Sequence, residues 1–184
     1  FGHAVEPALR SLEGGAGAQT YPSGLAAACF SLLACAKAGD HVLIVDTVYD
    51  PVRDFADRVL SGLGVGVTYY DPCIGGGIAA LLRPNTRAVY GETLGNPLVN
   101  VFDIEPVAAI AHEHGLPLII DSTFATPYLC RPIEYGADIV IHSATKFIGG
   151  HGTSMCGCVS DACDHHRAFP AGGVAAGSRG RRRP

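Results

Sequence analysis

The 184-residue sequence has no tryptophan, one methionine, two lysines and no long uninterrupted apolar run. The longest apolar stretch, residues 25–36, is interrupted by Ser31 and falls short of the about 18 residues that predict a membrane-spanning helix. The chain opens Phe1-Gly2-His3-Ala4, without a basic segment followed by an apolar one, so we expect no secretory signal peptide and no membrane partner.

Charged residues are also scarce, at 16% of the sequence against 48% hydrophobic residues, and the net charge is −4. So much apolar material argues against a disordered chain, and an acidic body argues against nucleic acid as a partner. The seven cysteines are an odd number scattered along the sequence, which favours reduced thiols and a cytoplasmic location over a disulfide framework.

Helical and extended patterns alternate along the chain. The helix within 25–37 is apolar all round and is expected to be buried on most sides, and Asp103 is expected to cap the helix that follows it. Apolar spacing predicts helices over 1–13, 25–37, 52–63 and 104–114, a helical turn over 78–82, and strands over 42–45, 65–70, 88–90, 116–120 and 139–142.

Short apolar strands separated by helices are typical of a mostly parallel sheet covered on both faces. We therefore expect an α/β fold, a three-layer αβα sandwich, over residues 1–158. Residues 159–184 end in an Arg/Gly/Ala-rich stretch without apolar periodicity, and we expect that tail to be disordered.

Polar residues follow four of the predicted strands directly. In open parallel sheets, ligands bind outside the carboxyl ends of the strands, so these residues are candidates for one site. They are Asp46, Thr47 and Tyr49; Glu92 and Asn96; Asp121, Ser122 and Thr123; and Ser143, Thr145 and Lys146. Ser23-Gly24-Leu25 precedes a predicted helix, whose first backbone N–H groups suit a phosphate.

One lysine, one aspartate, one tyrosine and a phosphate-binding turn match the needs of pyridoxal phosphate. Lys146 would form a Schiff base, and the Asp121 carboxylate would keep the pyridine nitrogen protonated. Tyr49 could stack on the ring and move a proton.

The motifs that hold these residues resemble the Cys/Met-metabolism family of pyridoxal-phosphate enzymes, which have fold type I. The resemblance runs from about residue 9 to 153, with the motifs in the family's order: 48–51 (VYDP), 92–97 (ETLGNP), 121–124 (DSTF) and 143–151 (SATKFIGGH). It implies that the chain covers part of the large cofactor-binding domain, truncated at both ends.

The resemblance also implies a role for each site residue. Lys146 and Tyr49 are the expected catalytic residues, and no metal site is expected. The residues expected to bind the cofactor are Ser23, Gly24, Leu25, Tyr49, Asn96, Asp121, Thr123, Ser143, Thr145 and Lys146. The implied substrate is a sulfur amino acid or an O-acylhomoserine, and the implied assembly is a homodimer or homotetramer.

The reaction stays open within the family. Residues 92–153 look more like O-acetylhomoserine sulfhydrylases, which favours γ-replacement through a lysine aldimine, whereas residues 21–87 look more like cystathionine β-lyases, which catalyse β-elimination. An inactive fragment of such an enzyme is a third reading. The thiols and imidazoles of Cys156, Cys158, Cys163, His165 and His166 match no strong zinc pattern, and His112 and His114 point to different sides of a helix.

Overall fold

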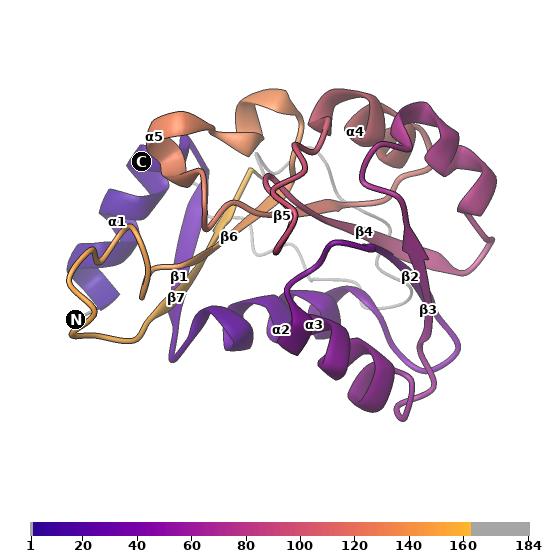
Figure 1. Ribbon diagram of the computed structural model, residues 1–184, viewed down its shortest axis with the longest axis horizontal. Coiled ribbons are helices and arrows are strands. Elements are labelled where there is room, and N and C mark those ends of the chain that lie inside the picture. The colour runs from indigo at the N-terminus through magenta and orange to yellow at the C-terminus, as the bar shows by residue number, and fades with distance from the viewer. Residues whose placement is uncertain (1, 163–184) are drawn as a thin grey trace, which may run out of the picture.

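The computed structural model describes residues 2–162, which form one seven-stranded sheet with helices on both faces (Figure 1). The strands are β1 (Gly17–Tyr21), β2 (His41–Val45), β3 (Gly66–Tyr70), β4 (Thr86–Glu92), β5 (Leu118–Asp121), β6 (Ile139–Ser143) and β7 (Gly157–Asp161). No helix within these residues is both long and apolar enough to cross a membrane.

The sheet is mostly parallel, as predicted. Its order is β1-β7-β6-β5-β4-β2-β3, and the five strands from β6 to β3 run parallel to their neighbours, whereas β7 pairs antiparallel with both β1 and β6. All five residues of β2 are buried, because both faces of the sheet are covered.

The helices complete the predicted three layers: α2 and α3 cover one face, and α4 and α5 lie over the other (Figure 1). The helices are α1 (Gly2–Glu13), α2 (Gly24–Cys35), α3 (Asp50–Phe55) with a π-helical continuation (Ala56–Leu60), α4 (Ile104–Glu113) and α5 (Thr126–Leu129), with 3-10 turns at Gly75–Leu81 and Pro132–Tyr135.

Two helices differ from expectation in detail. Helix α2 buries Ala27, Ala28 and Leu32 but leaves Phe30 56% exposed, so its apolar circumference is covered on one side only within residues 2–162. Asp103 does precede α4, yet its side chain makes no capping hydrogen bond.

The predicted domain boundary at residue 158 falls inside strand β7. Strand β7 continues through Asp161, with Cys158 and Ser160 fully buried between β1 and β6, so the ordered domain extends past the boundary. The predicted disorder of the remaining tail lies outside the described residues. Strand β1, which the sequence did not predict, exists because it pairs with β7 along its whole length.

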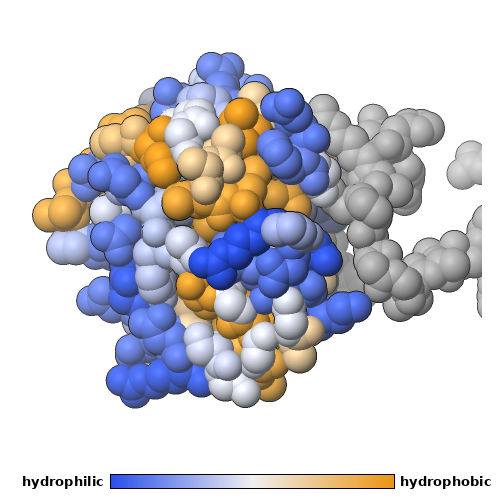
Figure 2. Space-filling model, turned by 90° about the vertical axis from the view of Figure 1, so that its right-hand side faces the viewer, coloured by the Kyte–Doolittle hydropathy of each residue, from blue (hydrophilic) through white to orange (hydrophobic). Residues whose placement is uncertain are grey.

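Strand β3 forms one edge of the sheet. Figure 2 views the molecule from this end, where apolar patches lie between hydrophilic side chains. The carboxyl ends of β2, β4, β5 and β6 all meet along one rim, because these strands are parallel. That rim is where the predicted site residues lie.

Candidate active site

A cavity of about 720 Å³ opens at this rim, and all ten residues predicted to bind the cofactor line it. They come from the start of α2 (Ser23, Gly24, Leu25), the segment before α3 (Tyr49), the segment after β4 (Asn96), the end of β5 (Asp121, Thr123), and the end of β6 with the turn after it (Ser143, Thr145, Lys146).

The amino end of α2 is built to present backbone N–H groups. The Ser23 hydroxyl accepts a hydrogen bond from the Ala26 N–H at 3.1 Å and so caps the helix. The N–H groups of Gly24 and Leu25 donate to no group among residues 2–162. Gly24 must be glycine here, since a Cβ atom would lie 2.4 Å from the Ser143 Cβ. Helix α2 therefore begins directly against the end of β6, with donors suited to an anion.

A chain of hydrogen bonds ties the end of β5 to the end of β6. The Thr123 N–H donates to Asp121 Oδ1 at 2.8 Å, and the Ser143 N–H donates to the Thr123 hydroxyl at 2.8 Å. These bonds fix the Asp121 carboxylate relative to the strand that leads to Lys146. Thr123 thus positions two cavity residues.

Thr145 also forms hydrogen bonds that its sequence motif does not predict. Its hydroxyl donates to the Cys156 carbonyl at 3.2 Å and accepts from the Cys156 N–H at 3.0 Å. The side chain closes the loop of residues 146–155 at its base, and Lys146, Phe147 and Met155 of this loop line the cavity.

Lys146 is exposed at the cavity wall and forms no ion pair with a carboxylate among residues 2–162. Its backbone N–H donates to the Ser143 carbonyl at 3.0 Å, which keeps the turn after β6 tight. An amine with no internal partner is able to react with a ligand in the cavity.

Two carboxyl groups lie side by side at the inner end of the cavity. Glu92 on β4 is in register with Asp121 on β5. Desolvation and the Asp121 charge raise the pKa of Glu92 to about 8. Desolvation also raises the pKa of Asp121, against the opposing effects of the Thr123 hydrogen bonds and the His142 charge.

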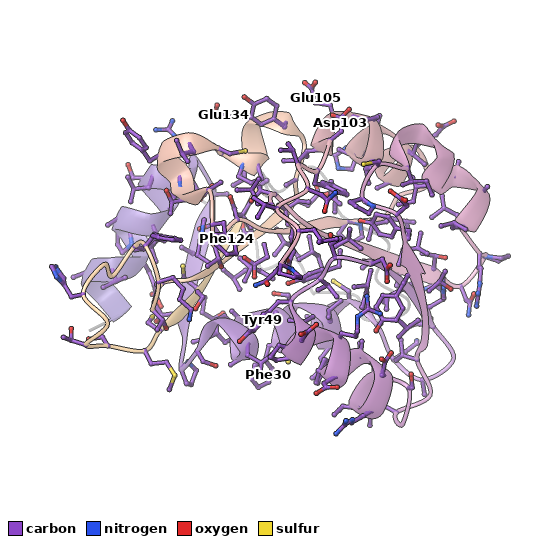
Figure 3. The ribbon with its side chains drawn as sticks, viewed as in Figure 1. Phe30, Tyr49, Asp103, Glu105, Phe124 and Glu134 are labelled. Carbon is purple, nitrogen blue, oxygen red and sulfur yellow. The ribbon has the colours of Figure 1, made fainter. Side chains whose placement is uncertain are left out.

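Aromatic side chains form the walls. Tyr49, which is 44% exposed, lies beside the start of α3, and Phe124 lies on the side of β5 (Figure 3). The ring centroids of Phe124 and Phe147 are 6.1 Å apart. A flat aromatic ligand would find both stacking surfaces and apolar contacts here.

Of the other residues that line the cavity, three bear on its chemistry but are given no cofactor role by the sequence: Glu92, Phe124 and Phe147. The sequence places Glu92 among the strand-end polar residues, and its position after β4 matches that of Asp121 after β5. Nothing local in the sequence distinguishes the two phenylalanines from core residues.

The histidines and thiols weighed as metal ligands take other positions. His112 Nε2 lies 2.8 Å from Asp138 Oδ2, and the His114 ring bonds the Ile110 carbonyl. Residues 2–162 hold no group of three or more side chains that could bind a metal ion. Cys163, His165 and His166 lie outside the described residues.

The residues present fit a pyridoxal phosphate group. An amine, a desolvated carboxylate, an aromatic ring and a helix amino end with unbonded N–H groups surround one cavity. The profile of the Cys/Met metabolism PLP-dependent enzymes matches residues 2–173. The chain belongs to this family. The predicted family and its cofactor, pyridoxal phosphate, are thereby confirmed.

Individual relatives in the family carry different reaction names. A Rhizobium johnstonii protein assigned as a cystathionine beta-lyase is 45% identical over 168 residues, which are 91% of this chain and 42% of the relative. The L-methionine gamma-lyase of Porphyromonas gingivalis is 43% identical over 171 residues, which are 92% of this chain and 43% of that enzyme.

A solved structure of the family has the same fold. The crystal structure of a Campylobacter jejuni protein assigned as an O-acetylhomoserine (thiol)-lyase superposes with a TM-score of 0.83 at 32% identity, over 87% of this chain and 40% of that one. It carries a pyridoxyl-lysine monophosphate. This chain thus spans about two fifths of the length of the relatives it matches, and the names of these relatives agree with the predicted class of lyases and transferases.

Proposed function

We propose that this chain supplies the cofactor-binding domain of an enzyme that makes or breaks carbon–sulfur bonds in sulfur amino acids. The observation that carries the proposal is the meeting of Lys146, Asp121 and Tyr49 with the amino end of α2 around one cavity. Bound pyridoxal phosphate would supply an electron sink for the substrate α-carbon.

Each residue has a defined task in this proposal. The Lys146 amine holds the cofactor covalently and later moves a proton at the substrate α-carbon. The Asp121 carboxylate pairs with the ring nitrogen, and Tyr49 stacks on the ring.

Five residues would bind the phosphate. Ser23, Gly24 and Leu25 offer the helix amino end, and Ser143 and Thr145 offer hydroxyl groups. The Thr145 hydroxyl already forms two hydrogen bonds with the Cys156 backbone, so we expect Thr145 to contribute less to phosphate binding than Ser143. Asn96 would approach the oxygen on the cofactor ring. Thr123 would lie on the side of the ring that faces Asp121.

For the reaction itself, we propose γ-replacement on an O-acylhomoserine, in which a thiol or sulfide takes the place of the leaving carboxylate. The structural similarity to the Campylobacter jejuni protein supports this assignment. Cystathionine β-elimination is the alternative, supported by the 45% identity to the Rhizobium johnstonii protein, and an inactive domain is the third possibility.

Borohydride reduction tests the covalent assignment. The chain is mixed with pyridoxal phosphate, reduced, digested and analysed by mass spectrometry. We expect a visible absorption band before reduction and a phosphopyridoxyl group on Lys146 afterwards. Lys37→Ala removes the only other lysine of the sequence and is the matched control. Labelling that Lys146→Ala leaves unchanged would overturn the assignment.

Product analysis distinguishes the reactions. The chain is supplied with O-acetylhomoserine and sulfide in one assay and with cystathionine in the other. Homocysteine from the first assay supports γ-replacement, and pyruvate from the second supports β-elimination. A cofactor-loaded chain that turns over neither substrate would favour an inactive domain.

We also propose a cytoplasmic homodimer or homotetramer. Large apolar side chains are exposed after β4, in α5 and at the cavity mouth, and a second copy of the chain would cover them. They are Leu98 (72% exposed), Val101 (74%), Tyr128 (92%), Leu129 (73%) and Met155 (71%). Sedimentation of the chain would contradict this assembly if it gave a monomer at every concentration, and cell fractionation tests the location.

A further inference from the structure

Glu92 lies behind Tyr49 at the inner end of the cavity. The residue is only 6% exposed, and its Oε1 accepts the backbone N–H of Tyr49 at 2.8 Å. The contact joins two segments that are 43 residues apart in the sequence. A buried carboxyl group that bonds the backbone of a cavity residue is a means of fixing that residue in place.

The segment before α3 that carries Tyr49 has several attachments, three of which tie it to α3, to the segment after β4 and to β4 itself. Arg53 donates to Asp46 Oδ1 at 2.6 Å, and the Asn96 N–H donates to the Thr47 carbonyl at 2.9 Å. The third is the bond from the Tyr49 N–H to Glu92. Of the three, only the bond to Glu92 acts on Tyr49 itself, and only this one comes from a buried side chain.

Glu92 and Asp121 cannot both ionise freely. They are register partners at the ends of adjacent strands, and both line the cavity. Two carboxylates in one desolvated site repel each other, so the pair holds a proton at pH values where a lone carboxyl group would not. Asp121 accepts the Thr123 N–H and experiences the His142 charge, whereas Glu92 accepts only the Tyr49 N–H among residues 2–162.

Other ionisable groups surround the pair, among them His142 on β6 and the buried Cys158 on β7, which both interact electrostatically with Asp121. Lys146 lines the same cavity from the turn after β6, the Tyr49 phenol lies at the cavity wall, and Tyr90 precedes the pair on β4. A cofactor ring that is protonated at its nitrogen adds a positive charge beside Asp121, which favours an ionised Asp121 and leaves the shared proton on Glu92.

Building on the proposed cofactor site, we propose that Glu92 is a positioning residue that holds Tyr49 at the cavity wall. In this role it retains its proton at neutral pH, so that Asp121 alone presents a negative charge to the cofactor ring. Glu92 touches neither substrate nor cofactor in this proposal, and it acts through Tyr49 and through Asp121.

NMR of the cofactor-free chain tests the contact directly. The amide signal of Tyr49 is followed between pH 6 and pH 9 in the 15N-labelled wild-type chain and in Glu92→Gln, which keeps the acceptor oxygen but cannot ionise. We expect the wild-type signal to move with a midpoint near pH 8, and the signal in Glu92→Gln to stay constant. Glu105→Gln, which changes an outward-facing glutamate on α4 (Figure 3), should leave the Tyr49 titration as in the wild type.

Pyridoxal phosphate binding provides the second measurement. Glu92→Gln should bind within about twofold of the wild type, because the neutral amide imitates the protonated acid. Glu92→Leu has a similar size but no acceptor, and losing the bond to the Tyr49 N–H should weaken binding about tenfold.

Two results would overturn the proposal: a wild-type Tyr49 amide that does not respond to pH, or equal cofactor affinities for the Gln and Leu variants. If Glu92→Leu does not fold, the comparison of wild type with Glu92→Gln decides alone. If even the wild-type chain binds no pyridoxal phosphate, the proposed function fails, and the NMR titration still decides whether Glu92 keeps its proton and holds Tyr49.

Discussion

We expect the stability of Glu92→Gln relative to the wild type to depend on pH. The free energy of unfolding of the variant minus that of the wild type should be larger at neutral pH than at acidic pH. The pKa of Glu92 is raised from 4.5 to about 8 in the folded chain, chiefly by desolvation. Below pH 4.5 the group is protonated in both folded and unfolded chains. Between pH 4.5 and pH 8 the unfolded chain is ionised while the folded chain keeps its proton, so unfolding releases a proton and the free energy of unfolding falls as the pH rises.

The size of the effect follows from the two pKa values. Within this window, each unit of pH increase lowers the free energy of unfolding by about 1.4 kcal/mol, because one proton is released on unfolding. Between pH 5 and pH 7.5 the wild type should therefore lose about 3 kcal/mol through Glu92. Glutamine keeps the acceptor for the Tyr49 N–H but cannot ionise, so the variant should not lose stability in this way as the pH rises.

Urea unfolding followed by circular dichroism measures the difference, since the chain has no tryptophan to report by fluorescence. The free energy of unfolding of Glu92→Gln minus that of the wild type should grow by about 3 kcal/mol from pH 5 to pH 7.5. Glu105→Gln removes an outward-facing glutamate instead and serves as the control (Figure 3). A difference between Glu92→Gln and the wild type that is flat over this pH range would refute the raised pKa and the reasoning built on it.

Three further substitutions test the packing around the cavity. Gly24→Ala places a methyl group against Ser143 and should cost about 1–3 kcal/mol in urea unfolding and weaken cofactor binding, whereas Gly76→Ala, which has nothing within 4 Å, should be tolerated. Thr123→Val removes the acceptor of the Ser143 N–H and should cost about 1–3 kcal/mol, with Thr123→Ser close to wild type in the same assay. Glu13→Ala removes the hydrogen-bond partner of the buried His142 on β6 and should cost about 1–3 kcal/mol; an unchanged midpoint of thermal unfolding would contradict the importance of this contact.

The sequence predicts the central strands well, because burial on both faces produces continuous apolar runs such as residues 42–45. It does not predict β1, whose residues Gly17–Tyr21 are mixed in character and gain their extended form from pairing with β7. The helix predicted over 52–63 continues α3 as a π-helical turn, in which the Ser61 N–H bonds the Ala56 carbonyl five residues earlier. Periodicity at 3.6 residues does not distinguish this local widening from a regular helix.

The candidate site is predictable to the extent that its residues are rare or lie in motifs. With two lysines in the chain, Lys146 stands out, and Asp121 follows a strand directly. The contribution of Glu92 is different in kind, because it depends on a hydrogen bond to the backbone of a residue 43 positions away. Nearly every residue has a backbone N–H, so the sequence does not indicate which one Glu92 bonds, and the three-dimensional structure is needed to identify Tyr49 as its partner.

The packing of the start of α2 against β6 and β7 makes the anion-binding half of the cavity depend on contacts between segments that are far apart in the sequence. A methyl group at Gly24 would strike Ser143, and one at Gly157 would lie 2.0 Å from the Ser23 carbonyl oxygen, so these segments touch across more than a hundred residues of intervening chain. Such closures are entropically expensive and late to form. Ligand binding at this site is therefore coupled to formation of the whole sheet. A phosphate-bearing molecule would bind the folded chain in preference to partly folded chains and would so stabilise the folded state.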